Sequence, residues 1–142
     1  MDYIGSILAL SGVLLGGSLT YFTNSKLKND ELDRQELRDE LKMRRELYSK
    51  FLAEANTLAL SALEQKSSNP TIFNELSKFT VEIELVASDA VLNKAKNIME
   101  HVVQLHQANW EDNGLSTTLS SLRSEFVAAI KIESAELKKA RT

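Results

Sequence analysis

The segment Leu47–Leu63, LYSKFLAEANTLALSAL, decides the fold of this chain. Its apolar side chains recur every three or four residues, which is the spacing of one face of an α-helix. The centre of that face is formed by Tyr48, Phe51, Ala55, Leu58 and Ala62, and Leu47, Leu52, Ala59 and Leu63 widen it. The pattern predicts an amphipathic helix that packs against a core of further helices.

A turn and a second helix are predicted directly after this segment. The polar run 67–70 ends with Asn69 and Pro70. Asparagine is favoured at the N-cap of a helix and proline at its first position. The stripe that follows consists of Ile72, Leu76, Phe79, Ile83 and Val86. We therefore expect a helix that begins at Pro70 and contributes a second apolar face.

A break in this helical pattern is predicted near Ala87–Ser88. The next stripe lies one residue out of register with the previous one and consists of Val91, Ala95, Ile98, Val102 and Leu105. Ser88 stands at the slip and is a good N-cap for a new helix. The apolar alternation within 81–85 is also compatible with a strand, but a lone strand in a helical chain has no pairing partner.

The last helix is predicted from about Ser116 to Lys139, after a turn at Glu111–Gly114. Its inward side chains are Leu119, Leu122, Phe126, Ala129 and Ile130. Beyond the first 17 residues the chain has one glycine and one proline, so helix-breaking residues are rare. Residues 47–142 are therefore expected to form an all-α domain, an antiparallel bundle of three to four helices.

A charged segment, residues 26–46, precedes the bundle. Its leucines lie too far apart for a broad buried stripe, and opposite charges recur four residues apart in Asp30–Arg34, Glu40–Arg44 and Glu46–Lys50. Such pairs each stabilise an exposed helix by about 0.2–0.5 kcal/mol. We expect a continuous helical stalk in which Arg44 and Arg45 are solvated. A weak coiled coil through Leu37 and Leu41 is the second interpretation, because arginines would fall on its seam.

Residues 1–25 carry the signature of a membrane anchor. The 20 residues Tyr3–Phe22 are uncharged, and as a helix they span about 30 Å, the thickness of a hydrocarbon core. Tyr3 at one end and Tyr21 and Phe22 at the other are expected at the membrane interfaces. A cleaved signal peptide remains an alternative, although Asp2 stands where such peptides carry a basic residue.

The charges around this segment predict its orientation. Only Asp2 precedes it, whereas Lys26, Lys28, Arg34 and Arg38 follow it. Because basic residues are retained on the cytoplasmic side, we expect a single-pass protein of the inner (cytoplasmic) membrane. Its N-terminus would lie outside and its helical domain in the cytoplasm.

Small residues form one face of the predicted anchor. Ala9, Gly12 and Gly16 lie at helical spacing, and Gly12–Gly16 is a GxxxG motif. Such a face lets two membrane helices approach closely. The predicted membrane helix can thus associate with another helix as well as anchor the chain.

Residues with catalytic or ligand-binding patterns are scarce. The chain has no cysteine, no phosphate-binding glycine loop and no nucleophile elbow. His101 and His106 stand five residues apart and point about 140° from each other on a helix, so they cannot chelate one metal ion together. We expect them to be ordinary surface or boundary residues. We predict no enzyme activity, metal or cofactor. The net charge of -3 gives no attraction to nucleic acid.

Trp110 is the one candidate contact residue of the helical domain. A tryptophan at the end of a helix can anchor a partner protein. More often such a residue covers the end of the bundle, which is the favoured interpretation. A contact with a partner protein is kept as the alternative.

Three short motifs resemble a common layout. They are RRELYSKFL at Arg44–Leu52, ELVASDAV at Glu84–Val91 and FVAA at Phe126–Ala129. With the N-terminal span, the chain is similar to uncharacterised bacterial and phage single-pass proteins that carry an anchor and a helical domain. The resemblance implies that architecture and no catalytic residues. Phage spanins and the ATP-synthase b subunit share the outline, but the charge orientation and the turn at Asn69–Pro70 differ from theirs.

These patterns lead to two expected functions. The first is a membrane-anchored adaptor or scaffold whose helical domain binds another protein or itself. The alternative is a membrane-perturbing effector or lysis-type protein, of phage or defence-system origin, that assembles through Gly12 and Gly16. Both place the lipid bilayer among the partners.

Overall fold

The computed structural model describes residues 3–107 and 115–141, with side-chain environments for 26–107 and 118–141. It contains the helices α1 (Tyr3–Glu64), η1 (Pro70–Phe73), α2 (Asn74–Val86), α3 (Asp89–Gln107) and α4 (Leu115–Ala140). No strand occurs in these ranges, so the chain is all-α as predicted. Residues 1–38 and 39–140 are two compact units, and α1 contributes to both.

The first unit consists of α1 alone as far as Arg38. The side chains of residues 26–36 are all exposed, which confirms the solvated helix predicted for this stretch. No helix in the part of the chain whose side chains are described is long and apolar enough to cross a membrane. The predicted anchor, residues 1–25, lies outside that part.

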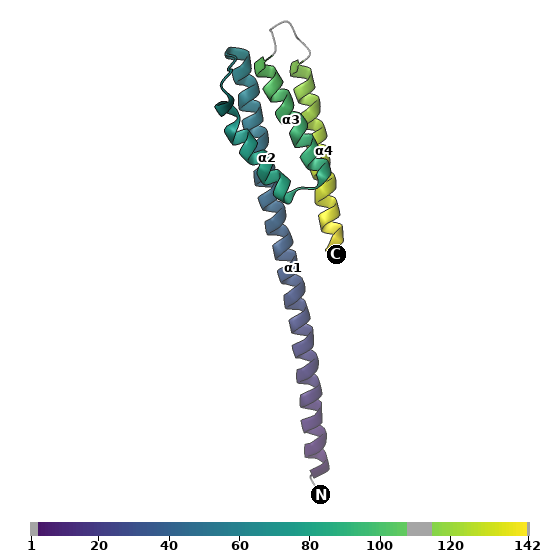
Figure 1. Cartoon of the computed structure of the whole chain (residues 1–142). Coiled ribbons are helices and arrows are strands. Elements are labelled where there is room, and N and C mark those ends of the chain that lie inside the picture. Colours follow the sequence, from purple (N-terminus) through teal and green to yellow (C-terminus); the bar gives the residue numbers. More distant parts are fainter. Residues whose placement is uncertain (1–2, 108–114, 142) are drawn as a thin grey trace. The chain divides into compact units, whose positions relative to one another are not determined.

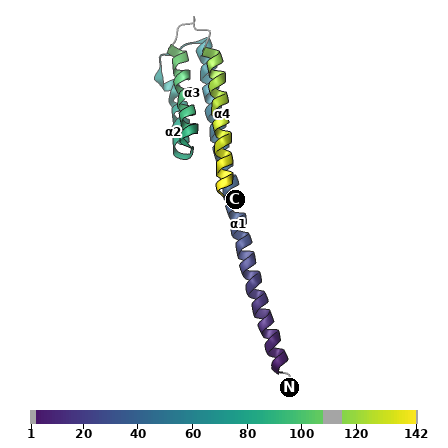
Figure 2. The same ribbon diagram turned by 90° about the vertical axis from the view of Figure 1, so that its right-hand side faces the viewer.

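The second unit is a bundle of the C-terminal part of α1 with α2, α3 and α4. Figures 1 and 2 show that successive helices of the bundle run antiparallel. Both views also show that α4 continues past the corner between α2 and α3. This confirms the antiparallel arrangement and gives four helices, the upper end of the predicted range.

The bundle core is built from the predicted stripes. Phe51 and Phe126 are fully buried, and their ring centroids lie 5.4 Å apart between α1 and α4. Tyr48 meets Phe126 edge-on at 5.8 Å. From the other helices the core receives Leu76, Ile83, Val91, Ala95, Ile98 and Val102, all fully buried.

Both predicted helix boundaries are confirmed. Asn69 is the N-cap of η1, where its Oδ1 accepts a hydrogen bond from the Thr71 N–H at 3.1 Å, and Pro70 follows at the first position. The first turn is a 3₁₀ turn that leads into α2. At the second boundary Ala87 is extended, with φ -89 and ψ 162, and ends α2. The Ser88 carbonyl accepts the first hydrogen bond of α3, from the Leu92 N–H at 3.0 Å.

Candidate functional site

A buried carboxylate lies at the corner between α2 and α3. Glu133 on α4 is only 5% exposed. It stands seven residues after Phe126, so the two lie on the same face of the helix, and that face is directed at the core. An ionised side chain at such a place requires partners, because an unpaired charge is costly to bury.

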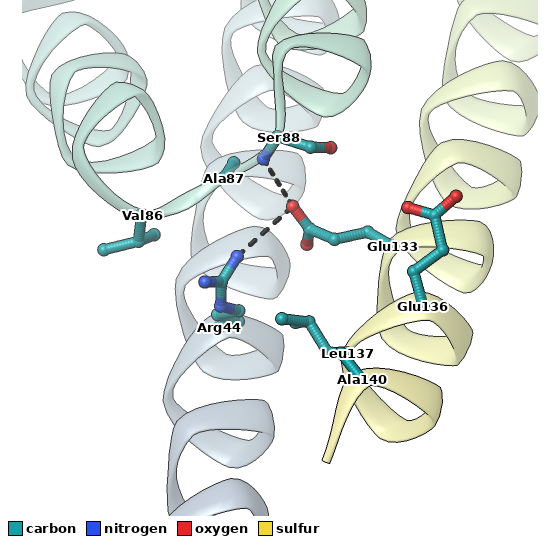
Figure 3. A pocket seen from close by; sticks show the side chains of 8 residues that line it. All are labelled: Arg44, Val86, Ala87, Ser88, Glu133, Glu136, Leu137 and Ala140. Atoms are coloured by element: carbon teal, nitrogen blue, oxygen red, sulfur yellow. Dashed lines mark hydrogen bonds and ion pairs between the residues drawn. The ribbon is translucent and has the colours of Figure 1, made fainter. Parts of the chain in front are cut away.

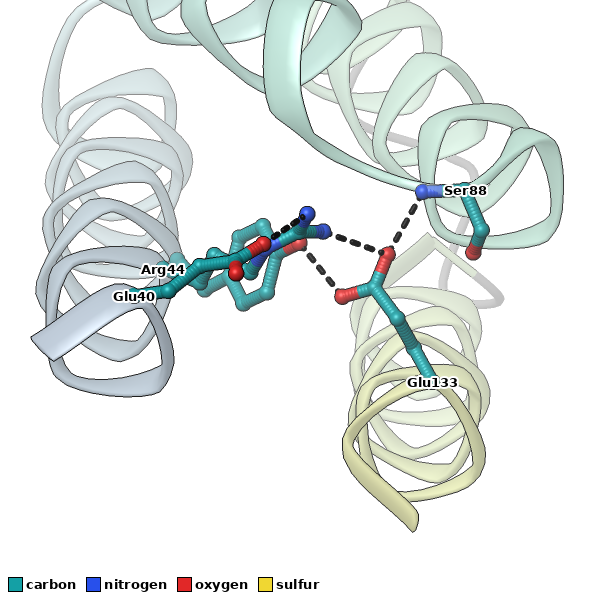
Figure 4. Close-up of polar contacts among 5 residues, drawn as sticks. Glu40, Arg44, Ser88 and Glu133 are labelled. Carbon is teal, nitrogen blue, oxygen red and sulfur yellow. Dashed lines mark hydrogen bonds and ion pairs between the residues drawn. The ribbon is translucent and has the colours of Figure 1, made fainter. Parts of the chain in front are cut away.

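Two other segments, α1 and the start of α3, supply those partners. The Tyr48 hydroxyl donates a hydrogen bond to Oε2 of Glu133 at 2.7 Å. The Ser88 N–H donates to Oε1 at 2.5 Å, and the Arg44 guanidinium lies 3.2 Å from the same oxygen. Figure 4 shows these groups converging on the carboxylate from different helices. One side chain of α4 is thereby bonded to α1 and to the start of α3.

Arg44 connects this carboxylate to a second one. Its guanidinium lies 2.8 Å from Oε1 of Glu40, one turn earlier on α1. Burial alone would lower the pKa of Arg44, but the hydrogen bonds with Glu40 and Tyr48 and the charge of Glu133 together outweigh it and raise the pKa. The guanidinium is therefore held in its charged form. The predicted Glu40–Arg44 pair is confirmed.

The solvated environment predicted for Arg44 is wrong, whereas Arg45 is exposed as expected. The Arg44 side chain is only 14% exposed because α4 brings Glu133 against it. Glu133 itself was not predicted. A signal for the pair exists in the sequence: Arg44 continues the stripe of Tyr48 and Phe51, and an acidic residue continues the facing stripe on α4. Opposite charges that interrupt two core stripes indicate a buried ion pair.

The environment of Tyr48 makes its ionisation unfavourable. Burial, and then the hydrogen bond that the phenol donates to Glu133, raise the pKa of Tyr48 well above its ordinary value of about 10. The neutral phenol is the form that fits the folded bundle. Its contribution to stability is complete below pH about 10 and is lost as the pH rises from there toward the higher folded-state pKa.

We therefore expect Tyr48 to resist alkaline titration. In the difference between wild type and Tyr48→Phe, phenolate absorbance at 295 nm should develop well above pH 10, together with loss of helical signal. Tyr3 and Tyr21, common to both proteins, cancel in the difference. A difference curve with its midpoint at about pH 10 would contradict the buried hydrogen bond.

A pocket of about 380 Å³ opens beside this polar cluster, below the α2–α3 corner. Figure 3 shows the corner on one side and the last turns of α4 on the other. We call it the corner pocket; its lining residues are Arg44, Val86, Ala87, Ser88, Glu133, Glu136, Leu137 and Ala140. Half of them are aliphatic, and Glu136 is exposed at the surface. The corner pocket is thus a concave site with apolar walls and charged groups at its edge.

A second polar cluster lies elsewhere in the bundle, around His106. Its Nε2 lies 3.0 Å from the Leu58 carbonyl oxygen, and its Nδ1 accepts a hydrogen bond from the Ser67 N–H at 3.4 Å. Because the carbonyl can only accept, the ring carries its proton on Nε2. Phe73 packs edge-on against the ring at 5.3 Å. His106 therefore holds the segment after α1 onto α3.

The surface or boundary position predicted for the two histidines is wrong, since His101 and His106 are each only 5% exposed and therefore buried. The angle between the two side chains around the helix axis does not place either of them at the surface, because neighbouring helices cover a wide arc of α3. Among the residues whose side chains are described, no group of three or more His, Cys, Asp or Glu is placed to hold a metal ion.

The remaining predicted site residues lie outside the part of the chain whose side chains are described. These are the association face of Ala9, Gly12 and Gly16, the interface anchors Tyr3, Tyr21 and Phe22, and the possible contact residue Trp110. The turn at Glu111–Gly114 lies outside it as well. They remain predictions.

Comparisons with protein-family models, with curated proteins and with solved structures give no match to this chain.

Proposed function

We propose that this chain is a membrane-anchored helical adaptor or scaffold, whose bundle associates with another protein or with a second copy of itself. The uncharged segment Tyr3–Phe22 supports the anchor. The basic residues that follow it support a cytoplasmic bundle at the inner membrane. The lipid bilayer is then one partner, and a protein is the other.

The observation that carries the association is the outer face of α2. Val81 and Leu85 lie one turn apart on this face and are 56% and 79% exposed. Leu85 is the most exposed large apolar side chain in the described part of the chain. The opposite face of α2 is already used, because Leu76 and Ile83 are fully buried there. Adjacent exposed apolar residues are typical of surfaces that contact another protein.

The test is the double substitution Val81→Ser/Leu85→Ser in the full-length chain. Crosslinking in native membranes should give adducts larger than the monomer with wild type and lose them with the variant. The fold should change little, because substitution of exposed side chains usually alters stability by less than about 0.5 kcal/mol. The amounts of monomer and of adduct are compared on one gel for the two proteins.

Ile132 on α4 provides the matched control. It is 61% exposed, so Ile132→Ser removes a comparable apolar side chain from a different face. We expect the adducts to persist in this variant. A wild-type chain that gives only monomer, or adducts that survive the α2 substitutions unchanged, would refute association through α2.

A further inference from the structure

The exposed apolar residues of α2 are bordered by carboxylates on both sides. Val81 and Leu85 form an exposed ridge along the outer face of this helix. Successive residues of a helix point about 100° apart, so Glu82 lies on one side of the ridge and Glu84 on the other. Glu75 lies two turns before Glu82 on the same side. We call these three glutamates the acidic rim; α2 has no basic residue on either side of its ridge.

Two lysines lie close to the acidic rim and do not cancel it. Lys78 continues the ridge itself, one turn earlier, and lies 3.5 Å from Glu75. Lys96 on α3 lies 3.5 Å from Glu84. All four of these side chains are more than half exposed, and exposed ion pairs of this kind are weak and easily exchanged for other partners. Glu82 makes no ion pair or side-chain hydrogen bond within the described part of the chain, so one carboxylate stays in excess.

The acidic rim disfavours a second copy of the chain as the partner of this face. When two helices pack side by side, the residues that border one ridge face those that border the other. In an antiparallel pair of α2 helices, the Glu82 side of one copy would meet the Glu82 side of its partner. In a parallel pair it would meet the Glu84 side. Carboxylates face carboxylates in both arrangements, and each copy offers only Lys78 on its ridge against three rim glutamates.

A helix with basic borders complements the same face. Its lysine or arginine side chains would meet carboxylates on both sides of the ridge, while its apolar side chains cover Val81 and Leu85. Charged residues at these flanking positions are the ones that set partner choice between paired helices.

We propose that the outer face of α2 binds an amphipathic helix of another protein, in which lysine or arginine residues border the apolar side chains. The ridge supplies the apolar contact, and the acidic rim determines which partner is accepted. This inference rests on the association through α2 proposed above and names the class of its partner.

The test uses two synthetic amphipathic peptides with the same leucine ridge, one bordered by lysine and the other by glutamate. Each labelled peptide is titrated with the full-length chain in a non-ionic detergent, and fluorescence anisotropy gives its Kd. We expect the lysine peptide to bind about tenfold more tightly, because opposite charges replace like charges on both sides of the ridge. Equal affinity of the two peptides, or tighter binding of the glutamate peptide, would overturn the proposal.

Two double variants separate the acidic rim from the net charge of the chain. Glu82→Gln/Glu84→Gln should nearly abolish the preference for the lysine peptide. Glu64→Gln/Glu136→Gln removes the same charge from exposed positions on α1 and α4 and should leave the preference unchanged. A preference that survives the first variant, or that falls equally in both, would show that the rim does not select the partner.

The variant Val81→Ser/Leu85→Ser separates this inference from the association on which it rests. Both peptides should lose affinity for it, and its crosslinked adducts should disappear. If the variant keeps its adducts and binds the lysine peptide as wild type does, association through α2 is wrong and the inference falls with it. If instead two differently tagged wild-type copies crosslink to each other, and this crosslink is lost with Val81→Ser/Leu85→Ser, the association stands and the inference alone is overturned.

Discussion

Glu133→Ala is expected to lower the free energy of unfolding of the bundle by about 3 kcal/mol. Removing one member of a buried ion pair typically costs about 3–5 kcal/mol, because the remaining charge and hydrogen-bond donors stay buried without partners. Here the Arg44 guanidinium, the Tyr48 hydroxyl and the Ser88 N–H all lose an acceptor. The low end of the range applies for two reasons. Arg44 keeps its ion pair with Glu40, and water can reach the cluster through the corner pocket. Urea unfolding followed by circular dichroism measures the change.

Two further variants isolate the cause of that loss. Glu136→Ala removes a carboxylate from the same helix and the same pocket, but from an exposed position, and should cost less than about 0.5 kcal/mol. Glu133→Gln keeps the side-chain volume and one carbonyl acceptor, so it should fall between the two. If Glu133→Ala were as stable as Glu136→Ala, the carboxylate would not hold the helices together.

Phe126→Ala is expected to destabilise the bundle by about 3–5 kcal/mol, the usual cost of truncating a buried phenylalanine. Its ring is fully buried and contacts the rings of both Tyr48 and Phe51, so the substitution leaves a cavity between α1 and α4. Because domains of this size are stable by about 5–15 kcal/mol, much of the folded population can be lost. Thermal unfolding of the two proteins side by side measures the effect.

The neighbouring residue gives the control for this substitution. Val127 follows Phe126 on α4 but is 37% exposed, so Val127→Ala opens no enclosed cavity. We expect its cost to be about 1 kcal/mol or less. Equal destabilisation by the two variants would show that helix propensity, and not core packing, determines the stability of α4.

The parts of the fold that depend on local signals were predictable. Asn69 and Pro70 end up as the N-cap and first residue of η1 because asparagine and proline have these preferences in any helix. The break at Ala87 follows from a one-residue slip of the apolar stripe, since a continuous helix would turn the second stripe away from the core. Periodicity also assigned Phe51, Ile83, Ile98 and Phe126 to the core.

The polar cluster was not predicted because its stability depends on contacts between distant segments. Arg44 and Glu133 are 89 residues apart, and the sequence does not give the register at which α1 and α4 pass each other. The same reason explains His106, whose partners Leu58 and Ser67 lie near the end of α1. From the sequence alone, a polar residue at the end of an apolar stripe is predicted to be solvated, because the residue that faces it on the neighbouring helix is not known.

The cluster also explains where the corner between α2 and α3 lies. Glu133 accepts the N–H of Ser88 directly at the corner, so α4 fixes the position at which α2 ends and α3 begins. The corner pocket lies beside that bond and is lined by the same carboxylate. Stability of the corner and the shape of the pocket are therefore linked through one side chain.

Protease accessibility of a C-terminal tag is the most direct test of a membrane-anchored cytoplasmic adaptor. In cells that express the full-length chain, the tag should be protected in intact spheroplasts and cleaved in inverted membrane vesicles. The protein should also remain with the membranes after alkaline washing. Cleavage in intact spheroplasts would place the bundle outside the cytoplasm, and recovery in the soluble fraction would contradict the anchor itself.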